Sequence, residues 1–140
     1  MKLLYLLDTN TISELGKQRP DANAESEIRR HQDAIALAAI TWHELLYGMY
    51  RLSPSPSRDR YREFIDDIVS VYPVLPYDAV AAEWHATQRA RLESVGKTPP
   101  YADGQIAAVA AVNHLVLVTA NTSDFQHFEG LDVENWVVRK

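Results

Sequence analysis

A short apolar run that ends in a carboxylate constrains the fold of this chain more than any other feature. Residues 3–7 are apolar or aromatic, and Asp8 and the polar segment Thr9-Asn10-Thr11 follow directly. A run of this length, bounded by polar turn formers, is too short for a buried helix and is typical of a strand covered on both faces. Ligands of parallel α/β sheets bind outside the carboxyl ends of the strands. We therefore expect a central strand here, with Asp8 at the functional edge of the sheet.

Helical and apolar segments alternate along the rest of the chain, which predicts an α/β fold with a mostly parallel sheet and helices on both faces. Further strands are expected at residues 34–40, 71–76, 115–119 and 133–138. Helices are expected at residues 12–16, 20–31, 41–52, 58–70, 79–95 and 102–113. The prolines in the 71–76 strand belong at a sheet edge. The Ser-Pro segment 53–57 is predicted to be the hinge of a helical hairpin.

The composition limits the classes of protein to which the chain can belong. With 140 residues, 46% of them hydrophobic, it is expected to form a single domain over residues 1–140. It contains no cysteine, which excludes disulfides, thiolate zinc sites and cysteine nucleophiles. We see no membrane span or signal peptide, and we expect a cytoplasmic location without a membrane partner. The net charge of −5 argues against binding nucleic acid by bulk positive charge.

Four acids follow strands or open helices in this scheme: Asp8, Glu44, Asp103 and Asp124. Each has an ordinary explanation when taken singly. Glu44 completes a capping box that Thr41 begins, Asp103 complements a helix dipole, and Asp8 and Asp124 cap turns. The joint pattern is more informative, because a cap needs only one side chain and Ser, Thr or Asn would serve equally well. We expect all four acids to meet at one edge of the sheet.

Carboxylates that meet in this way repel one another, and bound cations relieve the repulsion. An all-oxygen ligand set, without histidines at metal-site spacing, favours Mg²⁺ or Mn²⁺ over zinc. Two such ions roughly 4 Å apart hydrolyse phosphodiesters, one activating water and the other steadying the leaving oxygen. The pattern therefore predicts phosphodiester hydrolysis, with the four acids as metal ligands and catalytic groups.

At these four acids the chain resembles PIN-domain ribonucleases, most closely the VapC-type toxins of type II toxin-antitoxin systems. The resemblance covers nearly the whole length. It is carried by the Leu-Leu-Asp-Thr-Asn start, the Thr-Trp-His-Glu-Leu-Leu-Tyr-Gly helix, the Asp-Gly-Gln-Ile-Ala-Ala segment from Asp103, and Val-Thr-Ala-Asn-Thr-Ser-Asp-Phe ending at Phe125 with Gly130-Leu131 after it. Each segment alone is a weak signal, and the four in this order are specific.

The resemblance implies a PIN-like α/β/α sandwich with strand order 3-2-1-4-5 and a protruding helical hairpin. It implies Asp8, Glu44 and Asp103 as principal acids, with Asp124 as a fourth that often contributes through water. Hydroxyl or amide support is implied from Thr9, Asn10, Thr119 and Asn121. It further implies one or two Mg²⁺ or Mn²⁺ ions per subunit, an RNA substrate with transfer RNA favoured, a homodimer, and a VapB-like antitoxin whose tail covers the acidic cleft.

Two surface features each have a structural and a functional interpretation. Basic residues on and after the 79–95 helix form either a solvated helix face or an RNA-contacting rim, and the candidates are Arg89, Arg91 and Lys97. Apolar residues of the 41–52 helix are either core or a contact for a second subunit or an antitoxin; they are Trp42, Leu46, Tyr47, Met49 and Tyr50. The five histidines are scattered, and none is assigned a catalytic role.

Rival functions lack residues that they require. A haloacid dehalogenase phosphatase needs a second Asp two residues after Asp8, where this chain has Asn10. A response-regulator receiver needs a late lysine after a strand, and the segment Thr119-Ala120-Asn121 offers none. The five glycines form no phosphate-binding loop. The alternative that stays open is a non-catalytic PIN-fold module that binds metal or RNA without cleaving it.

Overall fold

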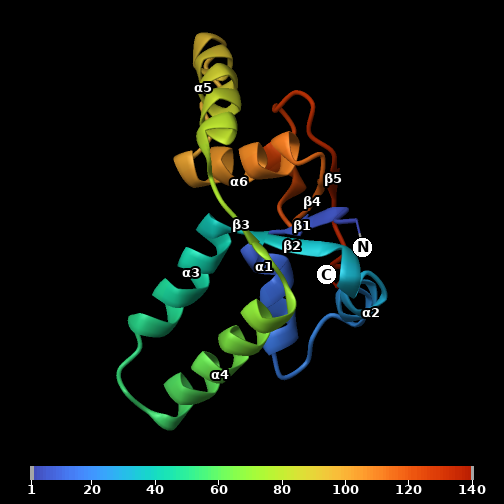
Figure 1. Ribbon diagram of the computed structural model, residues 1–140, viewed down its shortest axis with the longest axis vertical. Coiled ribbons are helices and arrows are strands. Elements are labelled where there is room, and N and C mark those ends of the chain that lie inside the picture. Colours follow the sequence, from blue (N-terminus) through green and yellow to red (C-terminus); the bar gives the residue numbers. More distant parts are fainter. Residues whose placement is uncertain (1, 140) are drawn as a thin grey trace.

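Five parallel strands form the centre of the computed structural model, which describes residues 2–139 (Figure 1). Residues 1 and 140, the ends of the predicted domain, lie outside the described residues. The strands are β1 (Tyr5–Leu7), β2 (Ile35–Ala38), β3 (Val74–Leu75), β4 (Val116–Val118) and β5 (Val133–Glu134). Their order in the sheet is β3-β2-β1-β4-β5, and each neighbouring pair is parallel. The predicted α/β class and strand order are confirmed.

Helices cover both faces of this sheet. They are α1 (Thr9–Ile12), α2 (Ala22–Arg30), α3 (Ala39–Tyr50), α4 (Pro56–Val71), α5 (Ala79–Ser94) and α6 (Tyr101–Val112). Short 3₁₀ helices are η1 (Ser13–Gly16), η2 (Gln32–Ala34) and η3 (Thr122–Phe125). Figure 1 shows α5 and α6 on one side of the sheet and α1 to α4 on the other. No helix within residues 2–139 combines the length and the apolar character needed to cross a membrane.

The alternation of side chains along the strands divides the interior into two cores. Leu6 of β1 and Leu117 of β4 pack with residues of α5 and α6, whereas their neighbours Leu7 and Val118 pack with residues of α1 to α4. Successive side chains of a strand point to opposite faces, so a central strand in a covered sheet must be apolar at every position. This is why the uninterrupted apolar runs of the sequence became β1 and β4.

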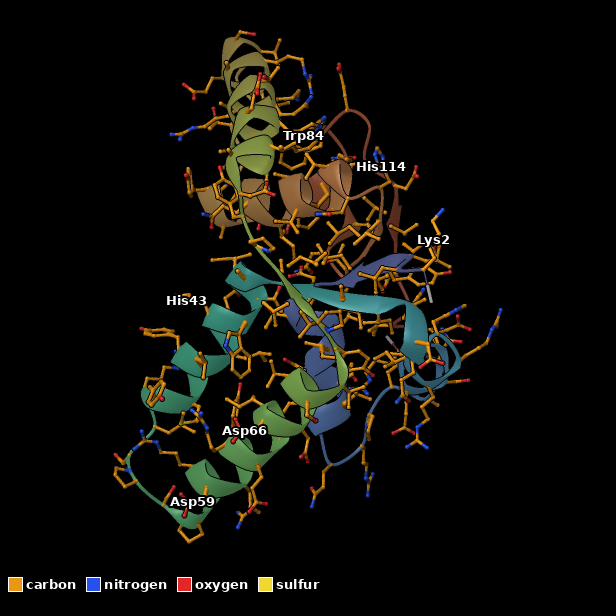
Figure 2. All side chains as sticks on the ribbon, viewed as in Figure 1. Lys2, His43, Asp59, Asp66, Trp84 and His114 are labelled. Carbon is orange, nitrogen blue, oxygen red and sulfur yellow. The ribbon has the colours of Figure 1, made fainter. Side chains whose placement is uncertain are left out.

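A helical hairpin projects from the sheet, as predicted. Helices α3 and α4 lie side by side, and Figure 2 places His43 near the sheet end of the hairpin and Asp59 at its tip. The hydroxyl of Ser55 accepts a hydrogen bond from the backbone N–H of Arg58 at 3.1 Å, and Pro56 occupies the first turn of α4, where a missing N–H is tolerated. The helix therefore begins at Pro56, two residues before the predicted start.

The predicted capping box at Thr41 and Glu44 is wrong. Helix α3 begins at Ala39, its N-cap is Ala38, and Thr41 lies buried inside the first turn with no hydrogen-bond partner for its hydroxyl. Strand β2 ends at Ala38, where its pairing with β3 also ends, and alanine is the best helix former. The chain therefore turns into the helix two residues before the threonine.

Two other boundaries also differ from the prediction. Helix α1 begins at Thr9 because Asp8 is itself the N-cap, whereas a start after the polar segment Thr9-Asn10-Thr11 was predicted. Strand β5 is limited to Val133 and Glu134. Beyond it, the chain runs along the outside of η1 and α2, where side chains rather than a neighbouring strand bind its backbone.

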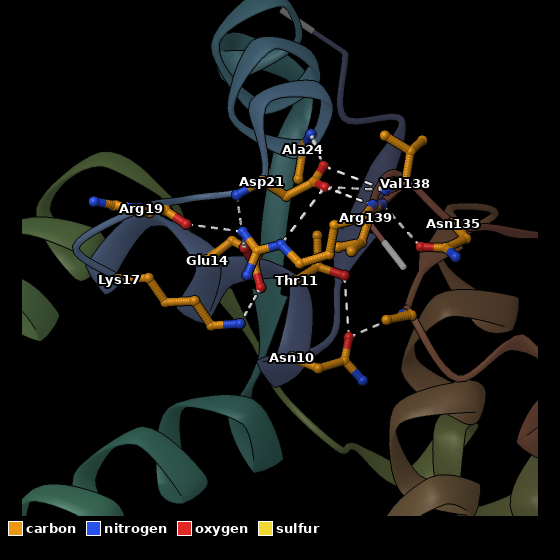
Figure 3. Close-up of polar contacts among 12 residues, drawn as sticks. Asn10, Thr11, Glu14, Lys17, Arg19, Asp21, Ala24, Asn135, Val138 and Arg139 are labelled. Atoms are coloured by element: carbon orange, nitrogen blue, oxygen red, sulfur yellow. Dashed lines mark hydrogen bonds and ion pairs between the residues drawn. The ribbon is translucent and has the colours of Figure 1, made fainter.

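These side chains belong to a group that we call the C-terminal clasp, formed by Glu14, Asp21, Val138 and Arg139 (Figure 3). The Asp21 carboxylate caps α2 and accepts hydrogen bonds from the backbone N–H groups of Val138 and Arg139, at 3.2 and 2.8 Å. The Arg139 guanidinium donates to Glu14 Oε1 at 2.8 Å. The clasp joins the C-terminal segment to the region of η1 and α2 through a buried pair of acids.

Candidate active site

The carboxylate of Asp8 lies at the carboxyl end of β1 and is held from several directions. Its Oδ1 accepts a hydrogen bond from the backbone N–H of Thr9 at 2.8 Å. Its Oδ2 accepts bonds from the hydroxyl of Thr119 at 2.9 Å and from the side-chain amide of Asn10 at 3.3 Å. The backbone N–H of Asp8 donates to Val118 O at 2.9 Å. Asp8 is therefore fixed between the ends of the two central strands.

The polar segments after β1 and β4 are joined by their own side chains. Asn10 Oδ1 accepts a hydrogen bond from the backbone N–H of Ala120 at 3.0 Å, and Asn10 Nδ2 donates to Thr119 Oγ1 at 3.3 Å. Thr119 Oγ1 also accepts a hydrogen bond from the backbone N–H of Asn121 at 3.1 Å. Asn121 thus contributes its backbone to this network. The hydroxyl of Thr9 is buried and has no hydrogen-bond partner.

Helices bring Glu44 and Asp103 to the same edge. Glu44 lies in the second turn of α3, which follows β2, and Asp103 is the third residue of α6. Gly104 allows α6 to approach α5 closely, because a Cβ at this position would lie 2.1 Å from Nε2 of His85. Packing at Gly104 therefore sets the position of the adjacent Asp103. Asp124 lies exposed in η3, just after β4.

The four acids influence one another electrostatically. Burial raises the pKa of Asp8 above 3.8, its hydrogen bonds oppose this, and the charge of Asp124 adds to the rise. The pKa of Asp103 is raised by burial and then by the charges of Asp124 and Asp8. Burial and then the charges of Asp8 and Asp103 raise the pKa of Glu44, while the nearby His43 opposes the rise. These acids form one set of mutually repelling charges, which we call the acidic rim.

The acidic rim matches a hard divalent cation in its ligand chemistry but is not a preformed metal cage. Its donors are carboxylate oxygens, the type that Mg²⁺ and Mn²⁺ prefer. Yet within residues 2–139 no three His, Asp or Glu side chains converge closely enough to hold a metal ion. That the four carboxylates converge as metal ligands stays a prediction. Mutual repulsion keeps such groups apart unless a cation or a proton offsets it.

The three basic RNA-binding candidates occupy different surroundings. Arg91 is used within the fold, because its guanidinium donates to Gln88 Oε1 and to the backbone carbonyl of His127, both at 2.7 Å. Arg89 is half exposed and pairs with Glu93 at 3.3 Å. Lys97 lies exposed after α5. Arg89 and Lys97 are therefore better placed than Arg91 to contact a ligand.

A cavity of about 690 Å³ beside α5 was missed by the sequence analysis. We call it the α5 cavity, and its polar and aromatic lining comprises Tyr77, His85, Arg89, Glu93, Ser94 and Tyr101. Burial lowers the pKa of His85 below 6.5, and Tyr77 shares a hydrogen bond with its Nδ1 at 2.9 Å. The only sequence signal for this cavity was the position of Tyr101, two residues before Asp103. Periodicity along α5 could not show which side chains meet a residue of α6.

Comparison with known proteins identifies the family. The PIN domain profile matches residues 5–131. This chain belongs to the PIN-domain family. A curated relative, the tRNA(fMet)-specific endonuclease VapC of Shigella flexneri, is 33% identical over 134 residues, which cover 96% of this chain and 98% of the relative.

Solved structures agree with this PIN-domain assignment. FitAcB from Neisseria gonorrhoeae is similar with a TM-score of 0.87 and 29% identity, covering 94% of this PIN domain and 97% of that chain. A DNA-bound VapBC from Salmonella typhimurium is similar with a TM-score of 0.83 and 28% identity, covering 96% and 98%. The likeness extends over nearly the whole of each chain, so the PIN fold and its relation to VapC proteins do not rest on a local motif.

Proposed function

We propose that this PIN domain is a divalent-metal-dependent endoribonuclease that acts as the toxin of a VapBC-type toxin-antitoxin pair. The acidic rim carries the proposal, because acids from four separate segments lie together at the carboxyl ends of the central strands, where burial and neighbouring negative charges raise the pKa of Asp8, Glu44 and Asp103. Supporting relatives are named VapC ribonucleases, among them Ribonuclease VapC2 of Haemophilus influenzae at 32% identity. The name of the Shigella flexneri relative favours transfer RNA as the substrate.

In this proposal the residues of the chain orient the reacting phosphate. Thr119 and Asn10 hold the Asp8 carboxylate in one orientation, so that its position does not depend on a bound ligand. Packing of α6 against α5 at Gly104 fixes Asp103. The second turn of α3 carries Glu44, which is more exposed. The rim therefore combines two acids held by their surroundings, Asp8 and Asp103, with two exposed acids, Glu44 and Asp124.

One or two Mg²⁺ or Mn²⁺ ions would be held by Asp8 and Asp103, with Glu44 and Asp124 completing the set. Such an ion supplies a Lewis acid that makes water nucleophilic and offsets phosphate charge. In the absence of cations, the acids repel both one another and the RNA backbone. This arrangement links substrate binding to cation binding in a protein with a net charge of −5.

The proposed partners are a VapB-like antitoxin and a second copy of the chain. The printed names of similar structures describe VapBC complexes. On α3, Tyr47 and Tyr50 are exposed by 60% and 59%, which leaves large aromatic rings available for a contact. Met49, by contrast, is buried and belongs to the core. The exposed aromatic face of α3 is therefore the stronger candidate for a protein interface.

A cleavage assay tests the proposed activity. Purified protein is incubated with transfer RNA and with unstructured RNA, in Mg²⁺, in Mn²⁺ and in chelator. We expect cleavage with either ion and none with chelator, and we expect Asp8→Asn and Asp103→Asn to abolish it. The matched control is Asp59→Asn, because Asp59 is also an acid in the first turn of its helix but lies at the hairpin tip (Figure 2).

Either of two outcomes would overturn the proposal. One is intact RNA at high concentrations of wild-type protein with both ions present. The other is equal cleavage by wild type, by Asp8→Asn and by Asp103→Asn, which would indicate a contaminating nuclease. If Asp59→Asn also loses activity, the loss in the rim variants reflects a general disturbance of the fold and not the removal of a rim carboxylate.

A non-catalytic module that binds metal or RNA is the second candidate. The observation that favours it is the lack of three converging acids within residues 2–139. Binding of RNA without cleavage, at cation concentrations that saturate the protein, would support the module. The two candidates share a fold and a ligand and differ in turnover, so the cleavage assay separates them.

A further inference from the structure

The α5 cavity has no part in the chemistry proposed above, although it is built like a nucleotide site. We propose that it binds one unstacked base of single-stranded RNA, next to the phosphate that the acidic rim receives. This inference rests on the proposed function, since it names how that site holds its substrate. A cavity of about 690 Å³ falls within the usual size range of small-molecule sites.

Tyr101 provides the stacking surface. Tyr101 is 53% exposed as a residue, and the guanidinium carbon of Arg89 lies 5.5 Å from the centroid of its ring. The buried ring of His85 lies behind it, with centroids 4.8 Å apart. Single-stranded RNA is commonly bound by stacking its bases on aromatic rings and on arginine guanidinium planes. Tyr101 and Arg89 form such a pair of surfaces, and the buried ring of His85 packs against Tyr101.

The polar groups of the cavity suit a base with amino or imino groups. Arg89 and Glu93 form an ion pair on an exposed helix face, and such pairs contribute little to stability. A nucleotide can therefore replace it at small cost, with Arg89 turning to a phosphate or a base face and Glu93 accepting from base N–H groups. Tyr77 and His85 bond to each other and hold the inner wall in place.

The cavity lies beside the acidic rim. Tyr101 and Asp103 both belong to the first turn of α6, and His85 packs on Gly104, the residue after Asp103. A strand whose base enters the cavity thus passes the amino end of α6, where Asp103 lies. The protein carries a net charge of −5, so affinity for RNA must come from local contacts of this kind.

The test is a double-mutant cycle between the ring of Tyr101 and a base of the RNA. A fluorescent single-stranded RNA and a series of versions, each with one abasic position, are titrated by anisotropy in Mg²⁺ against Asp8→Asn protein, which is expected not to cleave them. We expect one abasic position to weaken binding by roughly 5- to 150-fold, the usual effect of losing one stacked base. Tyr101→Ala should weaken binding similarly and remove the sensitivity to that position, whereas Tyr101→Phe should preserve both.

Val80→Ala is the matched control, because Val80 is a 63% exposed side chain on the same helix, α5, that does not line the cavity. It should leave RNA affinity unchanged. Arg89→Ala is the second cavity variant, for the case that Tyr101→Ala does not fold, which thermal melting reports. It should also weaken binding and reduce the sensitivity to the same abasic position.

Additive effects of Tyr101→Ala and every abasic position would overturn the base site, even if the wild-type protein cleaves RNA. Conversely, a coupled effect in a protein without cleavage activity would uphold the base site and overturn the proposed function. If Tyr101→Ala instead lowers the molar mass measured by light scattering without changing RNA affinity, the cavity is an interface between two copies of the chain, and the base site is wrong.

Discussion

The acidic rim and the C-terminal clasp are two groups of carboxylates that the fold treats in opposite ways. In the clasp, burial tends to raise the pKa of Glu14, but Lys17, the backbone of Asp21 and Arg139 bring it below 4.5. In the rim, burial and neighbouring acids raise the pKa of Asp8, Glu44 and Asp103.

This difference separates stability from function. Each clasp acid has cationic or N–H partners and holds distant parts of the chain together. The rim acids lack cationic partners at ion-pair distance within residues 2–139, so their repulsion is left for an external cation to relieve. Acids that a fold leaves unneutralised are better candidates for function than acids that it pairs, because an unpaired cluster lowers stability.

The largest expected effect comes from neutralising one acid of each group. Asp103→Asn should reduce the rate of RNA cleavage by about 100-fold or more, the scale of losing one charge-stabilising group, without lowering the melting temperature. Asp21→Asn should lower the melting temperature and leave cleavage intact well below it. Cleavage rates and thermal melts of both variants measure these opposite effects on activity and stability. A stable, inactive Asp21→Asn would contradict the division of roles.

Cation binding should stabilise only through the rim. Mg²⁺ is expected to raise the melting temperature in proportion to the logarithm of its concentration. At a Mg²⁺ concentration of 100 times Kd, the free energy of unfolding should increase by about 2.7 kcal/mol. Asp8→Asn should abolish this response. Arg139→Ala should retain it, although its melting temperature without Mg²⁺ should be lower than that of the wild type. Differential scanning calorimetry across a magnesium series is the measurement. An equal response in Asp8→Asn would place the cation elsewhere.

Arg139→Ala should destabilise the protein by about 1.5–3 kcal/mol, the usual contribution of hydrogen bonds to charged groups, because it leaves buried Glu14 with fewer partners. The control is Arg30→Ala, whose side chain is 70% exposed and pairs with Glu27 on one helix. This control should change stability by less than about 0.5 kcal/mol. Urea unfolding gives both values, and equal losses would show that the clasp is no stronger than a surface pair.

The smallest effect is a pair of opposite pH dependences. The lowered pKa of Glu14 means that its stabilisation is present above pH 4.5 and is lost as the pH falls through the folded-state pKa. The raised pKa of Asp8 means that stability is greater at low pH and is lost as the pH rises from 3.8 through its folded-state pKa. Metal-free Asp8→Asn should therefore be more stable than wild type at neutral pH. A destabilised variant at every pH would show that its hydrogen bonds outweigh the repulsion.

Much of the fold followed from local patterns in the sequence. The uninterrupted apolar runs before Asp8 and Thr119 predicted the central strands, since only a strand covered on both faces is apolar at each position. Asp78 was predicted to cap a long helix, and its carboxylate accepts the N–H of Ala81 at 2.9 Å. Such signals are short-range and depend little on the rest of the molecule.

Predictions that depended on contacts between distant residues fared less well. The Thr41 to Glu44 spacing fitted a capping box, but the end of the β2 and β3 pairing decided where α3 begins. Arg91 was an exposed candidate for RNA in the sequence, and in the fold it bonds to the carbonyl of His127. The clasp was not foreseen, because nothing local links Arg139 to acids more than a hundred residues away.

The sequence by itself determined the succession of strands and helices along the chain. It also placed acids after the central strands, because periodicity and capping act over a few residues. Only the tertiary structure decided how those acids are spaced, which of them are paired, and that Tyr101 meets Arg89 at a cavity. Distances between side chains from separate elements depend on how those elements pack, and close approaches such as that of His85 to Gly104 help to set them.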